Sequence, residues 1–259
     1  MATINFSKPL TIPKNPSKKF LYTLLEEAYC YFNAPCRISE SQLDPLGIAR
    51  DYQEERVAIF CALFAYGNVR AMIKFLKSCD LAALKKRESQ KICTHKPYRF
   101  QTQSEIQAFF KTLCEIQNPH TLFLDSYLQS CSILAGIQAL QKAFYQHLPQ
   151  SFRHSKGLIF LIGKPHSASP LKRWNMLLRW LVRKDKLDMG LWQDISPSDL
   201  ILPLDTHTFK ISQRLGIITR KTYDLKSALE ATHFLKSLDP KDPIKYDFAL
   251  YRMSQLKLL

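Results

Sequence analysis

Apolar residues recur at helical spacing along most of the chain, and no segment sustains the alternation of a β-strand. Between residues 54 and 79, two amphipathic stretches flank Tyr66-Gly67-Asn68, which predicts two helices joined at that tripeptide. Further helices are expected over residues 101–116 and 121–147, the second with a break. The apolar run 158–162 fits either a strand or a buried helical turn. The pattern predicts an all-α fold.

The most informative helix follows this run. Ser169 is a good N-cap and Pro170 a good first-turn residue, so we expect the helix to start near residue 170. One of its faces carries three basic residues and Asn175 together with the apolar Met176; the basic residues are Lys172, Arg179 and Arg183. The window 164–186 holds seven basic residues against one acidic residue. We therefore expect most of the excess positive charge to lie on this helix and the residues that flank it.

Three more helices complete the predicted fold after a proline-containing connector. They cover residues 205–215, 227–238 and 244–256. Gly216 ends the first of them, and Asp242-Pro243 precedes the last. No internal repeat is visible in the sequence.

The charge balance favours a polyanion partner. The chain has 37 Lys and Arg against 22 Asp and Glu, a formal net charge of +15. Cationic side chains that contact phosphates release condensed counterions, which favours binding to a nucleic acid. The alternative is that the protein is basic without binding a nucleic acid. No apolar run is long enough for a membrane span or a signal sequence. We expect a cytoplasmic chain that does not bind a membrane.

Metal and cofactor sites are not predicted. The seven cysteines lie between residues 30 and 131 without a C-x-x-C pair, which favours reduced, mostly buried thiols over a zinc site or an iron–sulfur cluster. The nearest approach to a phosphate-binding loop runs from Gly157 to Lys164, but it has one residue too many and is followed by Pro165 instead of Ser or Thr. We therefore expect no metal and no cofactor.

Two residues could form a nucleophile and its carboxylate partner. Lys172 is expected about one turn into its helix, where the helix N-terminus can also hold a phosphate. Its apolar neighbours and Arg173 favour the neutral amine that nucleophilic attack requires, whereas the alternative is a surface lysine on a basic helix. Asp205 starts the next helix within Pro203-Leu-Asp205-Thr-His207-Thr-Phe209, and its simplest role is that of an N-cap.

This last segment, with Arg214-Leu-Gly216, resembles the Asp-Thr-His segment of the endonuclease III-like, helix-hairpin-helix DNA glycosylases. In that superfamily the aspartate is the catalytic carboxylate, and bifunctional members carry a lysine just inside the second helix of the hairpin. Asp205 and Lys172 match these positions, and their separation of 33 residues is similar to that in the archaeal 8-oxoguanine DNA glycosylases. The stretch 172–256 also resembles a bacterial family described as uncharacterised.

The resemblance covers the chain well from about residue 160 and weakly before residue 55. The usual Leu-Pro-Gly-Val-Gly hairpin is replaced by the longer segment Gly163-Lys-Pro-His-Ser-Ala-Ser-Pro170, so the phosphate or ion contacts of that hairpin do not carry over directly. The cysteine cluster of endonuclease III is absent.

The resemblance also implies roles in DNA binding and base recognition. Flipped bases are read by edge hydrogen bonds and ring stacking, and the archaeal enzymes use an aspartate and an aromatic residue in a similar late helix. The candidate base pocket comprises Asp247, Phe248, Tyr251, Trp174 and Met176, with Trp192 as a further stacking candidate. The candidate DNA-binding residues are Asn68, Lys164, Ser169, Arg173, Arg179, Arg183 and His207. The alternatives are that the aromatic residues belong to the core and that Asn68 only joins two helices.

We therefore expect two helical lobes with a DNA-binding cleft. Residues 55–186 form the lobe with the hairpin and Lys172, and residues 1–54 with 187–259 form the lobe with Asp205. The resemblance implies a monomeric, nucleoid-associated DNA glycosylase with AP lyase activity in base excision repair. Its substrate is double-stranded DNA with a damaged base, from which it excises 8-oxoguanine, an oxidised purine, through a lysine Schiff base. The alternatives are a glycosylase for alkylated bases or oxidised pyrimidines, or a non-catalytic basic helical DNA-binding protein.

Overall fold

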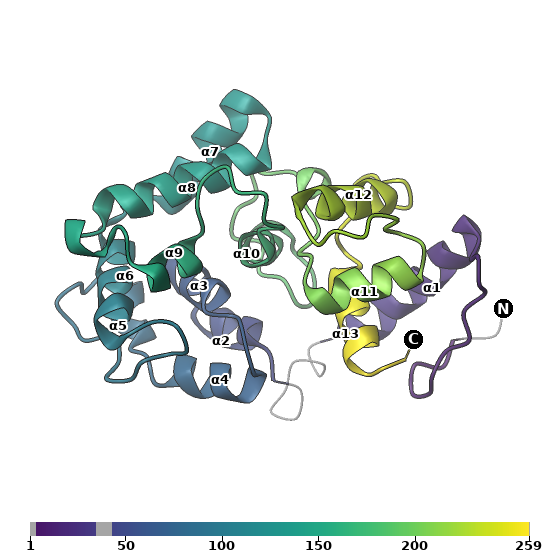
Figure 1. Ribbon diagram of the computed structural model, residues 1–259, viewed down its shortest axis with the longest axis horizontal. Helices are drawn as coiled ribbons and strands as arrows, with labels where there is room; N and C mark the ends of the chain where they lie inside the picture. The colour runs from purple at the N-terminus through teal and green to yellow at the C-terminus, as the bar shows by residue number, and fades with distance from the viewer. Residues whose placement is uncertain (1–3, 35–42, 259) are drawn as a thin grey trace. The chain divides into compact units, whose positions relative to one another are not determined.

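The computed structural model describes residues 4–34 and 43–258, and every long regular element in these residues is an α-helix (Figure 1). Short 3-10 helices and isolated β-bridges are the remaining regular structure of this part of the chain. The helices are α1 (Lys18–Phe32), α2 (Pro45–Tyr52), α3 (Glu55–Leu63), α4 (Val69–Lys77), α5 (Leu81–Lys85), α6 (Gln103–Glu115), α7 (Pro119–Ser130), α8 (Ile133–His147), α9 (Lys156–Ile162), α10 (Lys172–Val182), α11 (Thr206–Arg214), α12 (Leu225–Lys236) and α13 (Asp247–Gln255). The predicted all-α class is confirmed.

Most helices predicted from hydrophobic spacing are present. α3 and α4 are joined through Tyr66-Gly67-Asn68, and the apolar run 158–162 belongs to a helix, α9. The break expected within residues 121–147 separates α7 from α8. It falls at Cys131, whose φ of 47° lies in the left-handed region that ends a helix.

The starts of α10 and α13 lie later in the chain than predicted. α10 starts at Lys172 instead of residue 170, because Leu171 has a φ of 51° and interrupts the helical conformation. α13 starts at Asp247 instead of residue 244. The segment before it is held as turns, in which the Asp239 carboxylate accepts from the backbone N–H of Asp242 at 3.1 Å and Lys245 N–H donates to the carbonyl of Asp242 at 3.3 Å.

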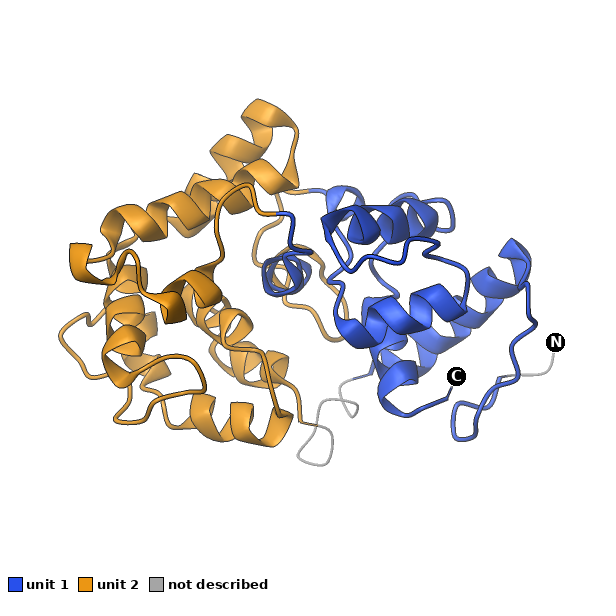
Figure 2. Ribbon diagram, in the orientation of Figure 1, with its two compact units in different colours: residues 1–37, 168–179, 196–259 blue, residues 38–167, 180–195 orange. Residues whose placement is uncertain are grey.

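The chain divides into two compact units (Figure 2). Unit 1 comprises residues 1–37, 168–179 and 196–259, and unit 2 comprises residues 38–167 and 180–195. These bounds differ from the predicted lobes, 55–186 and 1–54 with 187–259. Residues 38–54 belong to unit 2 because α2 packs on α3 and α4. Residues 168–179 belong to unit 1, which places Lys172 in the same unit as Asp205.

Unit 2 is built around α3, whose residues from Arg56 to Leu63 are all buried. Aromatic rings from neighbouring helices fill the core, and Phe60 lies 4.6 Å from Phe64 and 6.0 Å from Phe109, measured between ring centroids. The buried Arg56 is compensated by the Glu54 carboxylate at 3.2 Å and by backbone carbonyls. The core of unit 2 is therefore apolar around α3, and the buried Arg56 of this helix is paired with a carboxylate.

Unit 1 is built around α13, which packs against α1 and α11 (Figure 1). Lys245, just before α13, lies 2.8 Å from the Glu26 carboxylate of α1 and 2.7 Å from the Asp239 carboxylate. The first part of α10 belongs to this unit, and the Leu225 N–H at the start of α12 donates to the carbonyl of Ala168 at 2.9 Å. These bonds fix the segment that leads into α10 within unit 1.

The described residues also bear on two predictions, about membrane spans and about the cysteines. None of the described helices is long and apolar enough to cross a membrane. The cysteines in the described residues are free thiols, of which four are buried and two, Cys30 and Cys131, are exposed. Cys36 lies outside the described residues.

Candidate functional site

Lys172 is the first residue of α10, not a residue one turn inside it. The preceding Leu171 is in the left-handed region, which costs a leucine of the order of 1–3 kcal/mol. Its carbonyl accepts the Asn175 N–H at 2.9 Å, the first hydrogen bond of the helix, and the Asn175 side-chain amide donates to the carbonyl of Pro170 at 3.0 Å. These bonds fix the backbone that presents Lys172.

The Lys172 side chain is half-buried and is not held by a carboxylate. Its Nζ donates to the Met176 Sδ at 3.3 Å, and it makes no ion pair within the described residues. A thioether is a weak acceptor. The amine is therefore less firmly held than in a salt bridge, which suits a group that must react.

Asp205 is the N-cap of α11. Its Oδ1 accepts from the backbone N–H of His207 at 2.9 Å and of Thr208 at 2.7 Å. Its Oδ2 takes no hydrogen bond from the described residues, and the side chain is half-buried. The predicted capping role is confirmed, and it leaves one carboxylate oxygen of fixed orientation for another partner.

The charges of Lys172 and Asp205 both act on a third group in unit 1, Asp247. Burial raises the pKa of the Asp247 carboxyl, and Arg179 opposes that shift. The negative charge of Asp205 raises this pKa further, whereas the positive charge of Lys172 lowers it. The amine and the two carboxylates therefore share one electrostatic neighbourhood.

Asp247 forms a buried ion pair with Arg179. The Nη1 of Arg179 lies 2.5 Å from the Oδ2 of Asp247, and the two residues are 5% and 4% exposed. The guanidinium also lies 5.8 Å from the centroid of the Phe248 ring. The Asp247 carboxylate thus has a partner within the protein, which is not the open acceptor expected for base recognition.

The other predicted pocket residues divide into core and near-surface positions. Trp174, Met176 and Phe248 are buried, as is Trp192 of unit 2, whose indole N–H donates to the Glu55 carboxylate at 2.9 Å. Tyr251 is half-buried. Its ring lies 6.5 Å from the exposed His207 imidazole, edge to face. The core interpretation of these aromatic residues therefore holds for the tryptophans and Phe248 in this structure.

Two arginines of the predicted DNA-binding set are not on the surface. Arg179 is paired with Asp247, and Arg183 is buried between Asp185, at 2.9 Å, and Asp188. This differs from the expectation that both contact phosphate, because each guanidinium is already neutralised by carboxylates within its own unit. The remaining members of the set are exposed or half-buried, namely Asn68, Lys164, Ser169, Arg173 and His207.

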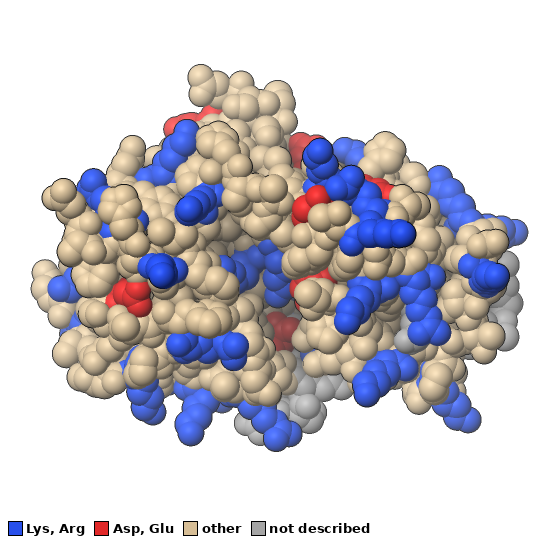
Figure 3. Space-filling view, in the orientation of Figure 1, with Lys and Arg blue, Asp and Glu red and all other residues tan. Residues whose placement is uncertain are grey.

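The surface nevertheless remains basic. On the face drawn in Figure 3, Lys and Arg side chains outnumber Asp and Glu on unit 1 and on unit 2. This distribution differs from a charge excess concentrated on α10. It suits a polyanion that contacts several elements.

Asn68 caps α4, which agrees with the helix-junction interpretation of this residue. Its Oδ1 accepts from the backbone N–H of Arg70 at 3.0 Å and of Ala71 at 3.2 Å. Its side chain is exposed, and the preceding Gly67 has a φ of 91° that favours glycine. The exposed junction is compatible with the second role, contact with DNA, that the sequence left open.

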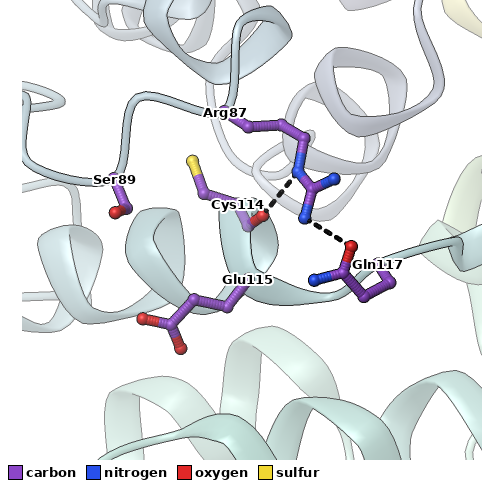
Figure 4. A pocket seen from close by; sticks show the side chains of 5 residues that line it. All are labelled: Arg87, Ser89, Cys114, Glu115 and Gln117. Atoms are coloured by element: carbon purple, nitrogen blue, oxygen red, sulfur yellow. Dashed lines mark hydrogen bonds between the residues drawn. The ribbon is translucent and has the colours of Figure 1, made fainter.

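A hollow on unit 2 is unrelated to these residues (Figure 4). Arg87 lies in it and donates from Nε to the carbonyl of Cys114 and from Nη2 to the Gln117 side chain, both at 3.0 Å. Ser89 and Glu115 complete the lining. Arg87 joins two segments of unit 2 here, and the hollow contains no residue of the predicted site.

Sequence reasoning missed Tyr223, which lies close to Asp205. Its hydroxyl donates to the carbonyl of Leu204 at 2.9 Å, and burial together with the charge of Asp205 raises its pKa to about 12. The residue precedes the Asp224 cap of α12 and belongs to no periodic segment, so only a tertiary contact reveals it. The Arg179–Asp247 pair was missed for the same reason, since its partners are 68 residues apart.

The comparison with known families adds one assignment. The family described as "Protein of unknown function (DUF2400)" matches residues 44–256. No curated protein and no solved structure shows significant similarity to the chain. The matched region includes Lys172, Asp205 and Asp247. The chain therefore belongs to the DUF2400 family, whose function is unknown.

Proposed function

We propose that the protein is a bifunctional DNA glycosylase with AP lyase activity of the helix-hairpin-helix superfamily. The observation that carries the proposal is the grouping within unit 1 of an amine without an ion pair and a carboxylate with a free oxygen. Lys172 and Asp205 both influence the titration of Asp247, so their charges act on the same region of unit 1. This reaction requires an amine nucleophile and a carboxylate that accepts its proton.

The order of elements is consistent with this superfamily. α9 and α10 follow one another along the chain, joined by residues 163–171, and Lys172 is the first residue of the second helix. Asp205 caps the next α-helix of the chain, α11. The superfamily's lysine and aspartate occupy corresponding places. In the proposed complex, DNA lies in a cleft of the glycosylase type, with phosphates contacted by exposed basic residues such as Lys164.

The chemistry follows from an amine attack on the sugar. The neutral Lys172 amine attacks C1′ of the extruded nucleotide as the C1′–N bond breaks, and the base leaves with the bonding electrons and takes up a proton. Asp205 accepts a proton from the attacking nitrogen and stabilises positive charge on the deoxyribose. The nitrogen lone pair then opens the C1′–O4′ bond, O4′ takes a proton, and a protonated Schiff base remains. Loss of a C2′ proton with expulsion of the 3′ phosphate nicks the strand.

We propose 8-oxoguanine as the substrate, on the basis of the 33-residue separation of Lys172 and Asp205. Tyr251 and His207 are the rings of the predicted pocket region that are not fully buried. Asp247 is 4% exposed and paired with Arg179, so a purine can reach its carboxylate only if the surrounding residues rearrange. In the ion-paired state the Asp247 charge is held by Arg179, and the charges of Lys172 and Asp205 both act on it.

A panel of duplexes with single defined lesions tests the activity. Each duplex carries one 8-oxoguanine, one oxidised pyrimidine or one alkylated base, and strand cleavage is measured with and without alkali. The proposal predicts cleavage of the 8-oxoguanine duplex without alkali, because the lyase step follows excision. Cleavage of another lesion instead would assign a different glycosylase. Tight binding with no cleavage of any duplex would favour a DNA-binding protein without catalysis.

A further inference from the structure

Three aromatic rings form an exposed cluster on unit 2, and one of them comes from the Tyr66-Gly67-Asn68 junction described above. The cluster, here called the aromatic platform, consists of Tyr66, Phe100 and Phe160. Phe100 is 57% exposed and Phe160 is 43% exposed. The centroids of Phe100 and Phe160 lie 4.8 Å apart, and that of Tyr66 lies 5.0 Å from Phe160. Exposed phenylalanines in contact with one another mark a binding surface more often than isolated ones do.

A buried amide holds the platform in place. The Tyr66 hydroxyl donates to the Gln101 Oε1, and the Gln101 Nε2 donates to the carbonyl of Gly157 at 2.7 Å. The Tyr98 hydroxyl donates to the carbonyl of Tyr66. Gln101 is 1% exposed, so these bonds are shielded from water. The three ring-bearing segments are therefore fixed to one another before any ligand binds.

A second set of bonds fixes α9, which carries Phe160, against α6. The Glu105 carboxylate accepts from the Ser155 hydroxyl and from the Thr102 N–H, the latter at 2.7 Å. A Cβ added at Gly157 would lie 2.5 Å from the Glu105 Oε1, so the Glu105 carboxylate occupies space that a side chain at residue 157 would take. The negative charge of Glu105 is thus already hydrogen-bonded within the protein.

The charge beside the platform is positive. The Arg99 guanidinium lies 5.5 Å from the centroid of the Phe100 ring. Arg99 also packs over Gly67, where an added Cβ would lie 2.7 Å from its Nη1. Arg70 and Lys156 are exposed at the starts of α4 and α9, the two helices that adjoin or carry platform residues. Sites for single-stranded nucleic acid combine aromatic rings, on which bases stack, with cationic side chains that contact the phosphates.

We propose that the aromatic platform binds unpaired nucleobases of a DNA strand by stacking, with Arg99 contacting the adjoining backbone. The choice of DNA as the partner rests on the proposed function. The residues of the platform all belong to unit 2, whereas Lys172 belongs to unit 1. A base–aromatic stack is sequence-tolerant, so the platform should accept any unpaired base.

The test uses two probes and exposed-residue variants. The probes are a single-stranded oligothymidine and a duplex with 2-aminopurine opposite a tetrahydrofuran abasic analogue, whose fluorescence falls when the aminopurine stacks. Phe100→Ala and Phe160→Ala are compared with Leu128→Ala, which removes a 60% exposed leucine from α7 of the same unit. We expect each phenylalanine variant to weaken oligothymidine binding by about tenfold or more and to reduce the quenching. Leu128→Ala should match wild type, and Arg99→Gln should lower the salt slope by about one.

Several results would overturn the platform. The wild-type protein could bind neither probe. The phenylalanine variants could bind and quench like wild type. The variants could instead change only the self-association of the protein, measured by sedimentation. The last result would make the patch a protein contact. Borohydride trapping on a natural abasic duplex is measured in parallel. Quenching by the wild-type protein without trapping would support base stacking on the platform and contradict the glycosylase proposal. Trapping by the wild-type protein, with the same quenching in both phenylalanine variants as in wild type, would support the glycosylase proposal and contradict base stacking.

Discussion

Replacing Asp247 with asparagine should destabilise the protein strongly, although the side chain keeps its size. The change leaves the Arg179 guanidinium buried without a counter-charge, since the two side chains are each only 6% exposed. Removing one partner of a buried ion pair costs about 3–5 kcal/mol. Asparagine still offers an oxygen to the guanidinium, so we expect a loss of unfolding free energy at the lower end of this range, about 3 kcal/mol.

The opposite change, Arg179→Met, should cost less at low pH than at high pH. Arginine cannot lose its proton, but a buried carboxyl can gain one. Burial already raises the pKa of Asp247, and loss of Arg179 removes the largest effect that opposes this shift. A carboxyl whose pKa is higher in the folded state than in the unfolded state favours folding at low pH, and this contribution is lost as the pH rises through the folded value. Arg179→Met should therefore lose stability as the pH rises, whereas Asp247→Asn should not show this dependence.

Urea unfolding followed by circular dichroism measures both effects, at about pH 5 and about pH 8. The double variant Arg179→Met/Asp247→Leu replaces the pair with apolar groups and should recover most of the lost stability. The reasoning is refuted if each single change costs less than about 1 kcal/mol, or if the double variant is no more stable than the two single variants.

Three further predictions concern Asp205, Tyr223 and Glu105. Asp205→Asn should abolish base excision but cost no more than about 1 kcal/mol in stability, since asparagine still caps α11; Asp224→Asn, at the equivalent cap of α12, should cost a similar amount and keep full activity. The same Asp205→Asn change should lower the pKa of Tyr223 from about 12, because the Asp205 charge contributes to that value; ultraviolet titration against Tyr223→Phe would show it, and an unaltered curve would separate the two residues. Burial of Glu105 works against ionisation, but hydrogen bonds from Ser155 and Thr102 hold its pKa below 4.5, so its contribution to stability is present above about pH 4.5 and lost as the pH falls through the folded value. Glu105→Gln should therefore lower stability at neutral pH and flatten the acid limb of the unfolding profile, and an unchanged limb would contradict this.

Local chemistry was predictable from the sequence. Hydrophobic spacing located α4, α6 and α11, because burial of one face imposes the helical period on the sequence. The N-cap at Asp205 was predictable for a similar reason, since its bonds reach only two and three residues along the chain.

Tertiary contacts set what the sequence could not predict. Lys172 begins α10 because Leu171 takes a left-handed conformation, which is supported by bonds from Asn175 and from Leu225 to the preceding segment. The basic face of α10 suggested phosphate contacts, but Arg179 finds its counter-charge on α13. Helical spacing gives the face on which a residue lies and not the element that packs against that face.

The glycosylase proposal depends on one covalent bond, between the Lys172 amine and the sugar. Borohydride trapping on a duplex with a natural abasic site, followed by peptide mapping, detects this bond directly. The proposal predicts an adduct on Lys172 with wild type, no adduct with Lys172→Gln at near-normal DNA binding, and full trapping with Lys186→Gln, which removes one charge from an exposed position outside the predicted DNA-binding set. An adduct on another amine, or a Lys172→Gln protein that still traps, would contradict it.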